Sequence, residues 1–340
     1  LLAEPFHYRD ERTARGVDEV HAIAPFAELY GRNGLQFLPF NTLYQFRIDA
    51  RLGDADTALL IPDLIAYLLT GTAVAERTNA STTGLLGVES GEWDDELADR
   101  LGIPSSILPT LVDPGATIGV LRAELAARIG KELPVIAVGS HDTASAVVAA
   151  PLSTPHSAYI SCGTWGLVGV ELTEPVLTDA AREANFTHEL GVDGRYRFLH
   201  NVTGLWLLSE TVRAWEAEDG SAIDLPDLLA AASAVAGEVP LFDANDSSLS
   251  APGDMPARIA ALLGPEAPST RPAFARSIVE SIAVAFAHAV QTASDLSGRE
   301  LDSIHLVGGG SLNRLLCQAT ADRTGLPVLA GPVEATALGN

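Results

Sequence analysis

The order of apolar and polar positions predicts helices that alternate with strands along most of the chain. The expected helices are 56–70, 120–129, 143–150, 203–217, 272–296 and 311–324. The expected strands are 135–139, 157–161, 166–172, 184–189, 195–200, 303–308 and 327–330, of which the first reads as a buried strand. Residues 76–84, rich in Thr, Asn, Ser and Gly, predict a loop, and the short turn 162–165 is typical of a hairpin. The pattern therefore predicts an α/β architecture with a mixed sheet.

A chain of 340 residues is long enough for two domains. Pro151 and Pro155 bracket a short connector, so we expect one domain over 1–150 and a second over 151–340. The chain opens at Leu1 without a Met and stops at Asn340 in what reads as the first turn of a helix. We therefore expect a piece that is truncated at both ends.

Charge excludes two classes of partner. The chain has 21 Lys and Arg residues against 44 Asp and Glu residues, a formal net charge of -23. Such a chain repels nucleic acid and anionic lipid, so we expect neither nucleic acid nor a membrane as partner. Any phosphate must be held locally, by backbone N–H groups, helix N-termini or a metal ion.

The cysteines and the apolar runs indicate a cytoplasmic protein. Cys162 and Cys317 stand alone, which favours a reducing compartment and argues against structural zinc. No unbroken apolar run has the length of a membrane span, and no signal-peptide pattern opens the chain.

The lysine count excludes one class of nucleotide site. Lys131 is the only lysine, and no Gly-x-x-x-x-Gly precedes it. A P-loop needs such a glycine loop followed by Lys and Ser or Thr. A P-loop kinase is therefore excluded, and Schiff-base chemistry has a single candidate.

The first candidate for chemistry is Ser140-His141-Asp142-Thr143, directly after the predicted buried strand. A carboxylate there can act as general base when a hydroxyl attacks a phosphoryl group. Alternatively, Asp142 only caps helix 143–150, a role compatible with the first. A hydrolase triad is not expected, because consecutive strand side chains diverge.

Two glycine turns are candidates for phosphate contacts. In turn 161–166 glycines permit close backbone approach and Thr164 adds a hydroxyl, although from the turn alone an ordinary hairpin is favoured. In 307–313 three successive glycines separate a strand from a helix and expose N–H groups, which favours a nucleotide contact over a plain tight turn. The run is not G-x-G-x-x-G, so NAD is not indicated.

These features occur in the order found in the FGGY family of carbohydrate kinases, which the chain resembles over essentially its whole length. Within the family it is most similar to L-rhamnulose kinases. The stretches that carry the resemblance are Tyr8–Thr13, Gly34–Gln45, Thr78–Thr83, Ser140–Val147, Cys162–Leu167, Asn201 with Gly204–Leu208, and Ala330–Asn340.

The resemblance implies a two-domain actin-like ATPase fold built on ribonuclease-H-like mixed sheets. Residues 1–150 would be the remainder of the sugar-binding domain, and 151–340 the nucleotide-binding domain. ATP with Mg²⁺ would phosphorylate L-rhamnulose on its primary hydroxyl, as in L-rhamnose catabolism, in a monomer or homodimer. Asp142 matches the catalytic base and also contacts the sugar. The other matched positions are His141, Thr143 and Asn201 for the sugar, and Thr164, Ser209, Gly309 and Gly310 for ATP.

Two departures from the family pattern qualify this expectation. Ser209 stands where the compared kinases carry Gln, so its contact with ATP would pass through water. The family's first phosphate loop would precede Leu1, which leaves the activity of this piece open. Two other functions stay open: a kinase of another ketose, L-fuculose or xylulose, and a non-catalytic ATP- or sugar-sensing protein. Loss of the base would mark the sensor, and Asp142 is present.

Overall fold

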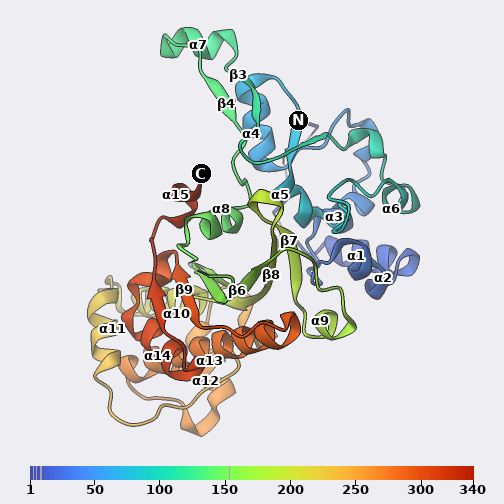
Figure 1. Ribbon diagram of the computed structural model, residues 1–340. Helices are drawn as coiled ribbons and strands as arrows, with labels where there is room; N and C mark the ends of the chain where they lie inside the picture. The colour runs from blue at the N-terminus through green and yellow to red at the C-terminus, as the bar shows by residue number, and fades with distance from the viewer. Residues whose placement is uncertain (3, 5, 8–9, 153) are drawn as a thin grey trace. The chain divides into compact units, whose positions relative to one another are not determined.

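A computed structural model describes residues 1–340 except 3, 5, 8, 9 and 153. The chain divides into two compact units, whose elements are labelled in Figure 1. Unit 1 comprises Leu1–Ser145, Glu171–Phe198 and Gly339–Asn340, and unit 2 comprises Ala146–Val170 and Leu199–Leu338.

Unit 1 is built mainly of short helices with two small sheets. Its helices are α1 (Thr13–Ile23), α2 (Phe26–Asn33), α3 (Thr42–Ile48), α4 (Ile61–Thr70), α5 (Arg77–Ala80), α6 (Asp95–Arg100), α7 (Ala123–Ile129) and α9 (Asp179–Glu183). Its strands are β1 (Val74–Glu76), β2 (Thr110–Val112), β3 (Thr117–Val120), β4 (Pro134–Ile136) and β7 (Thr187–Leu190). β1 pairs with β2 in parallel, and β3 pairs with β4 antiparallel.

A hydrophobic core of unit 1 joins α1, α2, α3 and α6. Fully buried apolar side chains from these helices and from the segments beside them meet there. They include Val20, Leu29, Leu43, Leu85, Leu97, Leu101 and Ile103. Helix α6 starts where the Asp94 carboxylate accepts from Leu97 N, and Asp94 also pairs with Arg32 at 2.7 Å. The cap and the ion pair thus fix α6 against α2.

His188 of β7 connects three segments of unit 1 while buried at 1% exposure. Its Nε2 accepts from Val176 N at 2.8 Å, so Nδ1 carries the proton and faces Gly34 O at 3.3 Å. Its ring stacks on Phe198, with 4.7 Å between centroids. Burial lowers the pKa of His188 to about 4, despite the favourable contact with Gly34 O.

This pKa predicts an acid-dependent loss of stability. Because the folded pKa is below the ordinary 6.5, the contribution is complete above about pH 6.5 and is lost as pH falls toward 4. The difference corresponds to about 3 kcal/mol at full loss. Urea unfolding of wild type and His188→Gln between pH 7.5 and 4 measures it. Glutamine at this position can accept from Val176 N and donate to Gly34 O without titrating, so the variant should lack this loss of stability. If its free energy of unfolding falls with pH in parallel with that of wild type, His188 is not the group responsible.

Unit 2 contains the larger sheet and the longer helices. Its helices are α10 (Trp206–Asp219), α11 (Leu225–Ser233), α12 (Met255–Leu263), α13 (Arg271–Ser297) and α14 (Arg314–Thr324). Its strands are β5 (Ser157–Cys162), β9 (Ser303–Val307) and β10 (Val328–Ala330). Four elements cross between the units: α8 (Asp142–Ala149), β6 (Trp165–Leu172), β8 (Tyr196–Thr203) and α15 (Ala335–Gly339).

The sheet is mixed, as predicted. Its strands follow in the order β10, β9, β5, β6 and β8, and β8 begins in unit 1, where β7 is its neighbour. β9 pairs in parallel with β5 and β10, whereas β5 and β6 form an antiparallel hairpin. β9 is buried at every position, as expected for a strand between two others under helices.

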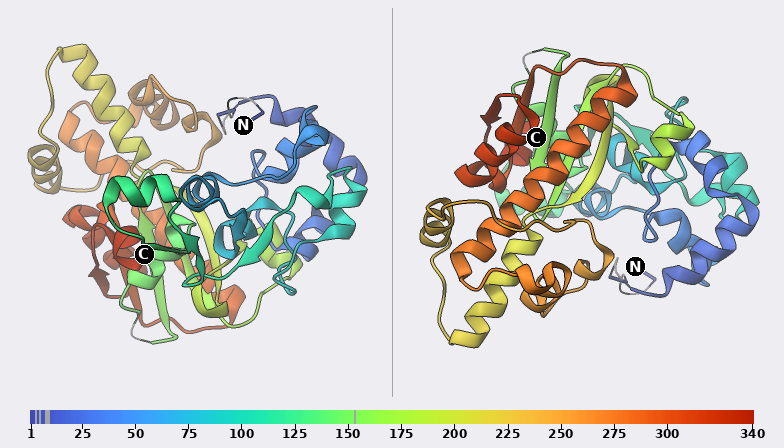
Figure 2. Two further views of the ribbon diagram at one scale, coloured as in Figure 1. Left: turned by 90° about the horizontal axis from the view of Figure 1, so that it is seen from above. Right: turned by 90° about the horizontal axis from the view of Figure 1, so that it is seen from below.

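Helices cover both faces of this sheet in unit 2. On one face α13 crosses the strands (Figure 2), and the ring of Phe286 fills the space that a side chain at Gly166 would need. On the other face Val147 of α8 packs with Tyr159 and Leu199. Helix α13 is apolar and long enough to cross a membrane, but 61% of its most apolar stretch is buried inside the protein, as in a soluble core helix.

Several predicted elements are confirmed and two are wrong. The hairpin, the long helix and the strand–turn–helix near the C-terminus occur at the predicted places, with helix starts displaced by a few residues. The buried strand 135–139 is wrong: β4 ends at Ile136, which is 45% exposed, because β4 pairs only with β3 among the described residues. The loop 76–84 is also wrong, since α5 and the 3₁₀ turn Ser81–Thr83 occupy most of it.

Candidate active site

Asp142 is the first residue of α8, and its side chain is 80% exposed. Its Oδ1 accepts from Thr143 N at 2.6 Å and from Thr143 Oγ1 at 3.2 Å. The Nδ1 atom of His141 lies 3.5 Å from the same oxygen. The carboxylate is thus oriented by its neighbours yet accessible, as a group that accepts a proton from a bound hydroxyl must be.

The backbone before Asp142 is held by Glu76, which is 2% exposed. Ser140 donates to Glu76 Oε2 from both its N–H and its hydroxyl, each at 2.9 Å. Thr78 N donates to Oε1 at 2.8 Å and Thr78 Oγ1 to Oε2 at 2.5 Å. His141 N donates in turn to Thr78 Oγ1 at 3.2 Å. A single carboxylate therefore connects α5 with the segment that leads to Asp142.

Asp63 of α4 binds the backbone of Glu76. Its Oδ1 accepts from Glu76 N at 3.1 Å, and the residue is 3% exposed. Burial raises the pKa of Asp63 to about 7; the N–H of Glu76 opposes the rise and the carboxylate of Glu76 adds to it.

His141 faces a buried ion pair. Its Nε2 lies 3.7 Å from Glu189 Oε2, which is 3.0 Å from Nη2 of Arg197. Arg197 is fully buried and also donates weakly to Leu190 O, at 3.4 Å from Nε and from Nη2. Burial, and then the charge of Arg197, lower the pKa of His141, with Glu189 opposing them. Thr143 N donates to Nδ1 of His141 at 3.3 Å, so the proton of a neutral His141 lies on Nε2, which can donate to a sugar hydroxyl.

In unit 2 the two predicted glycine turns lie side by side. A side chain at Gly308 would meet Cys162 O at 2.8 Å, and one at Gly310 would meet Cys162 Sγ at 2.5 Å. Gly308 also has φ of 82°, which side chains rarely adopt. By contrast, side chains at Gly163 and Gly309 would meet nothing within 4 Å. Gly308 and Gly310 thus allow the turns to pack, while Gly163 and Gly309 face open space.

The start of α10 is attached to the first of these turns. Leu205 N donates to Gly163 O at 3.0 Å, and Trp206 N donates to Thr164 O at 3.1 Å. Ser209 follows in the first turn of α10 and is exposed, while Asn201 lies on β8 and is partly exposed. The structure therefore brings Thr164, Ser209, Gly309 and Gly310 onto connected segments of one unit.

The sequence did not reveal Glu76, Asp63, Glu189 or Arg197 as parts of a site. The available signal was Glu76 directly before Arg77-Thr78-Asn79, where a side chain can accept from the first N–H groups of a helical turn. Among the described residues no three His, Cys, Asp or Glu side chains converge on a possible metal position.

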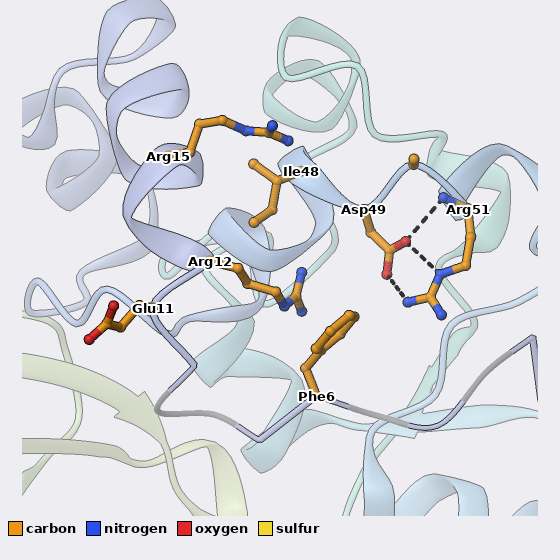
Figure 3. Close-up of a pocket in the computed structure, with 8 residues that line it drawn as sticks. Phe6, Glu11, Arg12, Arg15, Ile48, Asp49 and Arg51 are labelled. Atoms are coloured by element: carbon orange, nitrogen blue, oxygen red, sulfur yellow. Dashed lines mark hydrogen bonds and ion pairs between the residues drawn. The ribbon is translucent and has the colours of Figure 1, made fainter.

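A separate pocket of about 580 Å³ lies in unit 1 and is shown in Figure 3. Arg12 faces the ring of Phe6, its guanidinium carbon 3.9 Å from the ring centroid, while Asp49 is paired with Arg51 at 2.9 Å. Arg12 belongs to the first motif of the resemblance, of which Tyr8 and Arg9 lie outside the described residues. Among the described residues, those that line this pocket include none of the predicted site residues.

Comparison with family models gives two matches that together span nearly the whole chain. Residues 2–149 match the N-terminal domain of the FGGY family of carbohydrate kinases, and residues 158–340 match its C-terminal domain. The chain belongs to this family. The sugar kinase activity expected from the resemblance is thereby confirmed at the level of the family.

Curated relatives of this FGGY kinase include rhamnulokinases. The rhamnulokinase of Enterobacter sp. (strain 638) is 41% identical over 348 residues, which cover 99% of this chain and 68% of the relative. The rhamnulokinase of Pectobacterium carotovorum subsp. carotovorum (strain PC1) is 42% identical over 344 residues, again covering 99% and 68%.

Solved structures of sugar kinases share the fold of this FGGY kinase. A xylulose kinase from Rhodospirillum rubrum superposes with a TM-score of 0.74 at 24% identity, covering 96% of this chain and 67% of that one. Plasmodium falciparum glycerol kinase with ADP gives 0.77 at 17% identity, covering 99% and 69%. At these identities the likeness establishes the fold alone, and it confirms the predicted actin-like α/β class.

Proposed function

We propose that this FGGY kinase transfers the γ-phosphoryl group of ATP to the 1-hydroxyl of L-rhamnulose. The observation that carries the proposal is the 41% identity with rhamnulokinases over 99% of the chain. The exposed carboxylate of Asp142 at the start of α8 supports it, since such a group can reach a bound sugar.

In the proposed reaction the sugar oxygen bonds to the γ-phosphorus while the bond to the oxygen of ADP breaks. Asp142 takes the proton that the hydroxyl loses. His141, Thr143 and Asn201 hold the sugar through hydrogen bonds. The neutral imidazole favoured at His141 suits this role, because its Nε2–H can donate to a hydroxyl while Nδ1 accepts from Thr143 N.

We assign the nucleotide to unit 2. Gly309 and Thr164 lie on the adjacent glycine turns, where backbone N–H groups can approach phosphate closely. Gly310 and Ser209 complete the proposed set. In a chain with net charge -23 such local donors have to supply the attraction. Mg²⁺ bound with ATP would neutralise phosphate charge, with phosphate oxygens among its ligands.

The remaining assignments follow from the family. We propose that residues 1–150 form the sugar-binding part and 151–340 the nucleotide-binding part, in a cytoplasmic enzyme. The similarity to relatives named rhamnulokinase favours L-rhamnulose over other ketoses as the substrate of this chain.

A panel of ketoses tests the substrate. ADP release is measured with L-rhamnulose, L-fuculose and xylulose at equal concentrations, with ATP and Mg²⁺. We expect kcat/KM for L-rhamnulose to be at least about tenfold higher than for the others, because a site built to hydrogen-bond particular hydroxyls strongly rejects analogues that leave polar groups unpaired. A higher value for another ketose would overturn the substrate assignment, and ATP binding without turnover of any sugar would favour a sensor.

A further inference from the structure

Glu76 makes more hydrogen bonds than its local role requires. It caps the four-residue helix α5, for which one oxygen suffices, as in the Ser, Thr, Asp and Asn caps of other helices. Its second oxygen accepts from both the N–H and the hydroxyl of Ser140, which is 64 positions away in the chain. A structural cap alone does not explain this long-range contact.

Burying a carboxylate is costly unless hydrogen bonds or a counter-charge compensate it. No salt bridge involving Glu76 is found in the described part of the chain, so its compensation comes from N–H and O–H donors. Two of these donors are backbone N–H groups that cannot rotate, those of Thr78 and Ser140. The carboxylate therefore fixes the distance between α5 and the backbone at Ser140.

The contacts of Glu76 hold Ser140 and His141, the two residues directly before the proposed base Asp142. Ser140 N donates directly to the carboxylate of Glu76. His141 N donates to Thr78 Oγ1, which in turn donates to the same carboxylate. Helix α8 begins at the next residue, Asp142, so these contacts determine where its first turn lies.

We propose that Glu76 is a positioning residue for phosphoryl transfer. It holds the backbone of Ser140 and His141 and thereby the place of the Asp142 carboxylate. This inference rests on the proposed function, in which Asp142 is the base. In this role Glu76 acts through the backbone and not on the substrate or the reacting atoms.

Glu76→Gln tests the proposal with almost no change of shape. A carboxylate offers an acceptor to both Thr78 N and Ser140 N, whereas an amide has one oxygen. Its NH₂ group must then face a backbone N–H, at α5 or at Ser140. We expect kcat to fall on the order of 10²-fold, the scale for misplacing a reacting group by about 1 Å. The KM for ATP should change less than about twofold, because the nucleotide is assigned to unit 2.

Asp94→Asn is the matched control. Asp94 also caps a helix of unit 1 and binds a distant side chain, Arg32, but has no contact with the 140–143 segment in the described interactions. It should reduce the free energy of unfolding comparably to Glu76→Gln while leaving kcat within about twofold. Equal losses of kcat in both variants would mean that Glu76 acts only through general stability, which overturns the proposal.

Amide hydrogen exchange separates this inference from the proposed function. In Glu76→Gln we expect exchange at Ser140 and His141 to accelerate at least about tenfold, with exchange in the α1–α3 core unchanged. Unchanged exchange at both amides, or faster exchange with unchanged kcat, would overturn the positioning role. If the wild type phosphorylates no ketose, the proposed function is wrong. Accelerated exchange in Glu76→Gln would in that case still show that Glu76 fixes the backbone at Ser140 and His141.

Discussion

Asp142→Asn is expected to lower kcat for sugar phosphorylation by about 10²–10⁴-fold, the usual contribution of a positioned general base. The amide keeps the oxygen that accepts from Thr143 N but cannot take the proton of the hydroxyl. Since the side chain is 80% exposed, the free energy of unfolding should change by less than about 0.5 kcal/mol. Steady-state kinetics with ATP and L-rhamnulose, together with urea unfolding, measure both quantities.

Asp95→Asn provides the control for this variant. Asp95 is the exposed first residue of α6, as Asp142 is of α8, and it lies in the same unit. It tests whether loss of a negative charge at a helix start affects turnover by itself. Asp95→Asn should keep kcat within about twofold of wild type. Retention of wild-type kcat by Asp142→Asn would remove Asp142 from the role of base.

The elements with long, strong patterns were predictable from the sequence. Helix α13 was predicted within a residue at each end because its apolar period runs unbroken between two clear signals. Thr270 caps its start through Ala273 N, and Gly298 ends it in a left-handed conformation. The β5–β6 hairpin was equally clear, since strand patterns flank a two-residue turn that contains Gly163.

The errors occurred where local composition was misleading. Residues 76–84 have the composition of a loop, yet each hydroxyl of the turn Ser81–Thr83 donates to the carbonyl three residues before it. These hydroxyls are therefore satisfied by local backbone carbonyls, and composition alone does not show whether such residues form a loop or a short 3₁₀ turn. The apolar run 135–139 failed for a different reason. Periodicity cannot report what covers a strand, and of this run only Ala137 and Gly139 are buried.

The site was predictable only as far as its residues are contiguous in sequence. His141, Asp142 and Thr143 were found together because they form one motif. Glu76 and Glu189 reach the same segment through tertiary contacts, and no spacing in a single sequence encodes such a pairing. An arginine at position 197, directly before Phe198 and Leu199 in a strand, was a further visible sign of a buried charge, beside Glu76 at the start of α5.

Arg197→Met is expected to reduce the free energy of unfolding by about 3–5 kcal/mol, the usual cost of leaving a buried charge without its partner. Arg197 is fully buried, and the side chain of Glu189 is 9% exposed. Methionine fills much of the volume but removes the 3.0 Å ion pair, and the carboxylate of Glu189 keeps the 3.7 Å contact to the neutral His141. Urea unfolding at pH 7.5 measures the loss, and Arg15→Met, which removes an exposed partner of Glu19, should cost less than about 1 kcal/mol.

The double variant Glu189→Gln with Arg197→Met decides whether the loss comes from the charge or from packing. If the unpaired carboxylate is responsible, neutralising it should recover more than about half of the stability lost in Arg197→Met, because the two effects are coupled through one contact. If the loss comes from the shape of the arginine, the double variant should be no more stable than the single one. Equal small losses in Arg197→Met and Arg15→Met would show that the buried pair contributes no more than an exposed one.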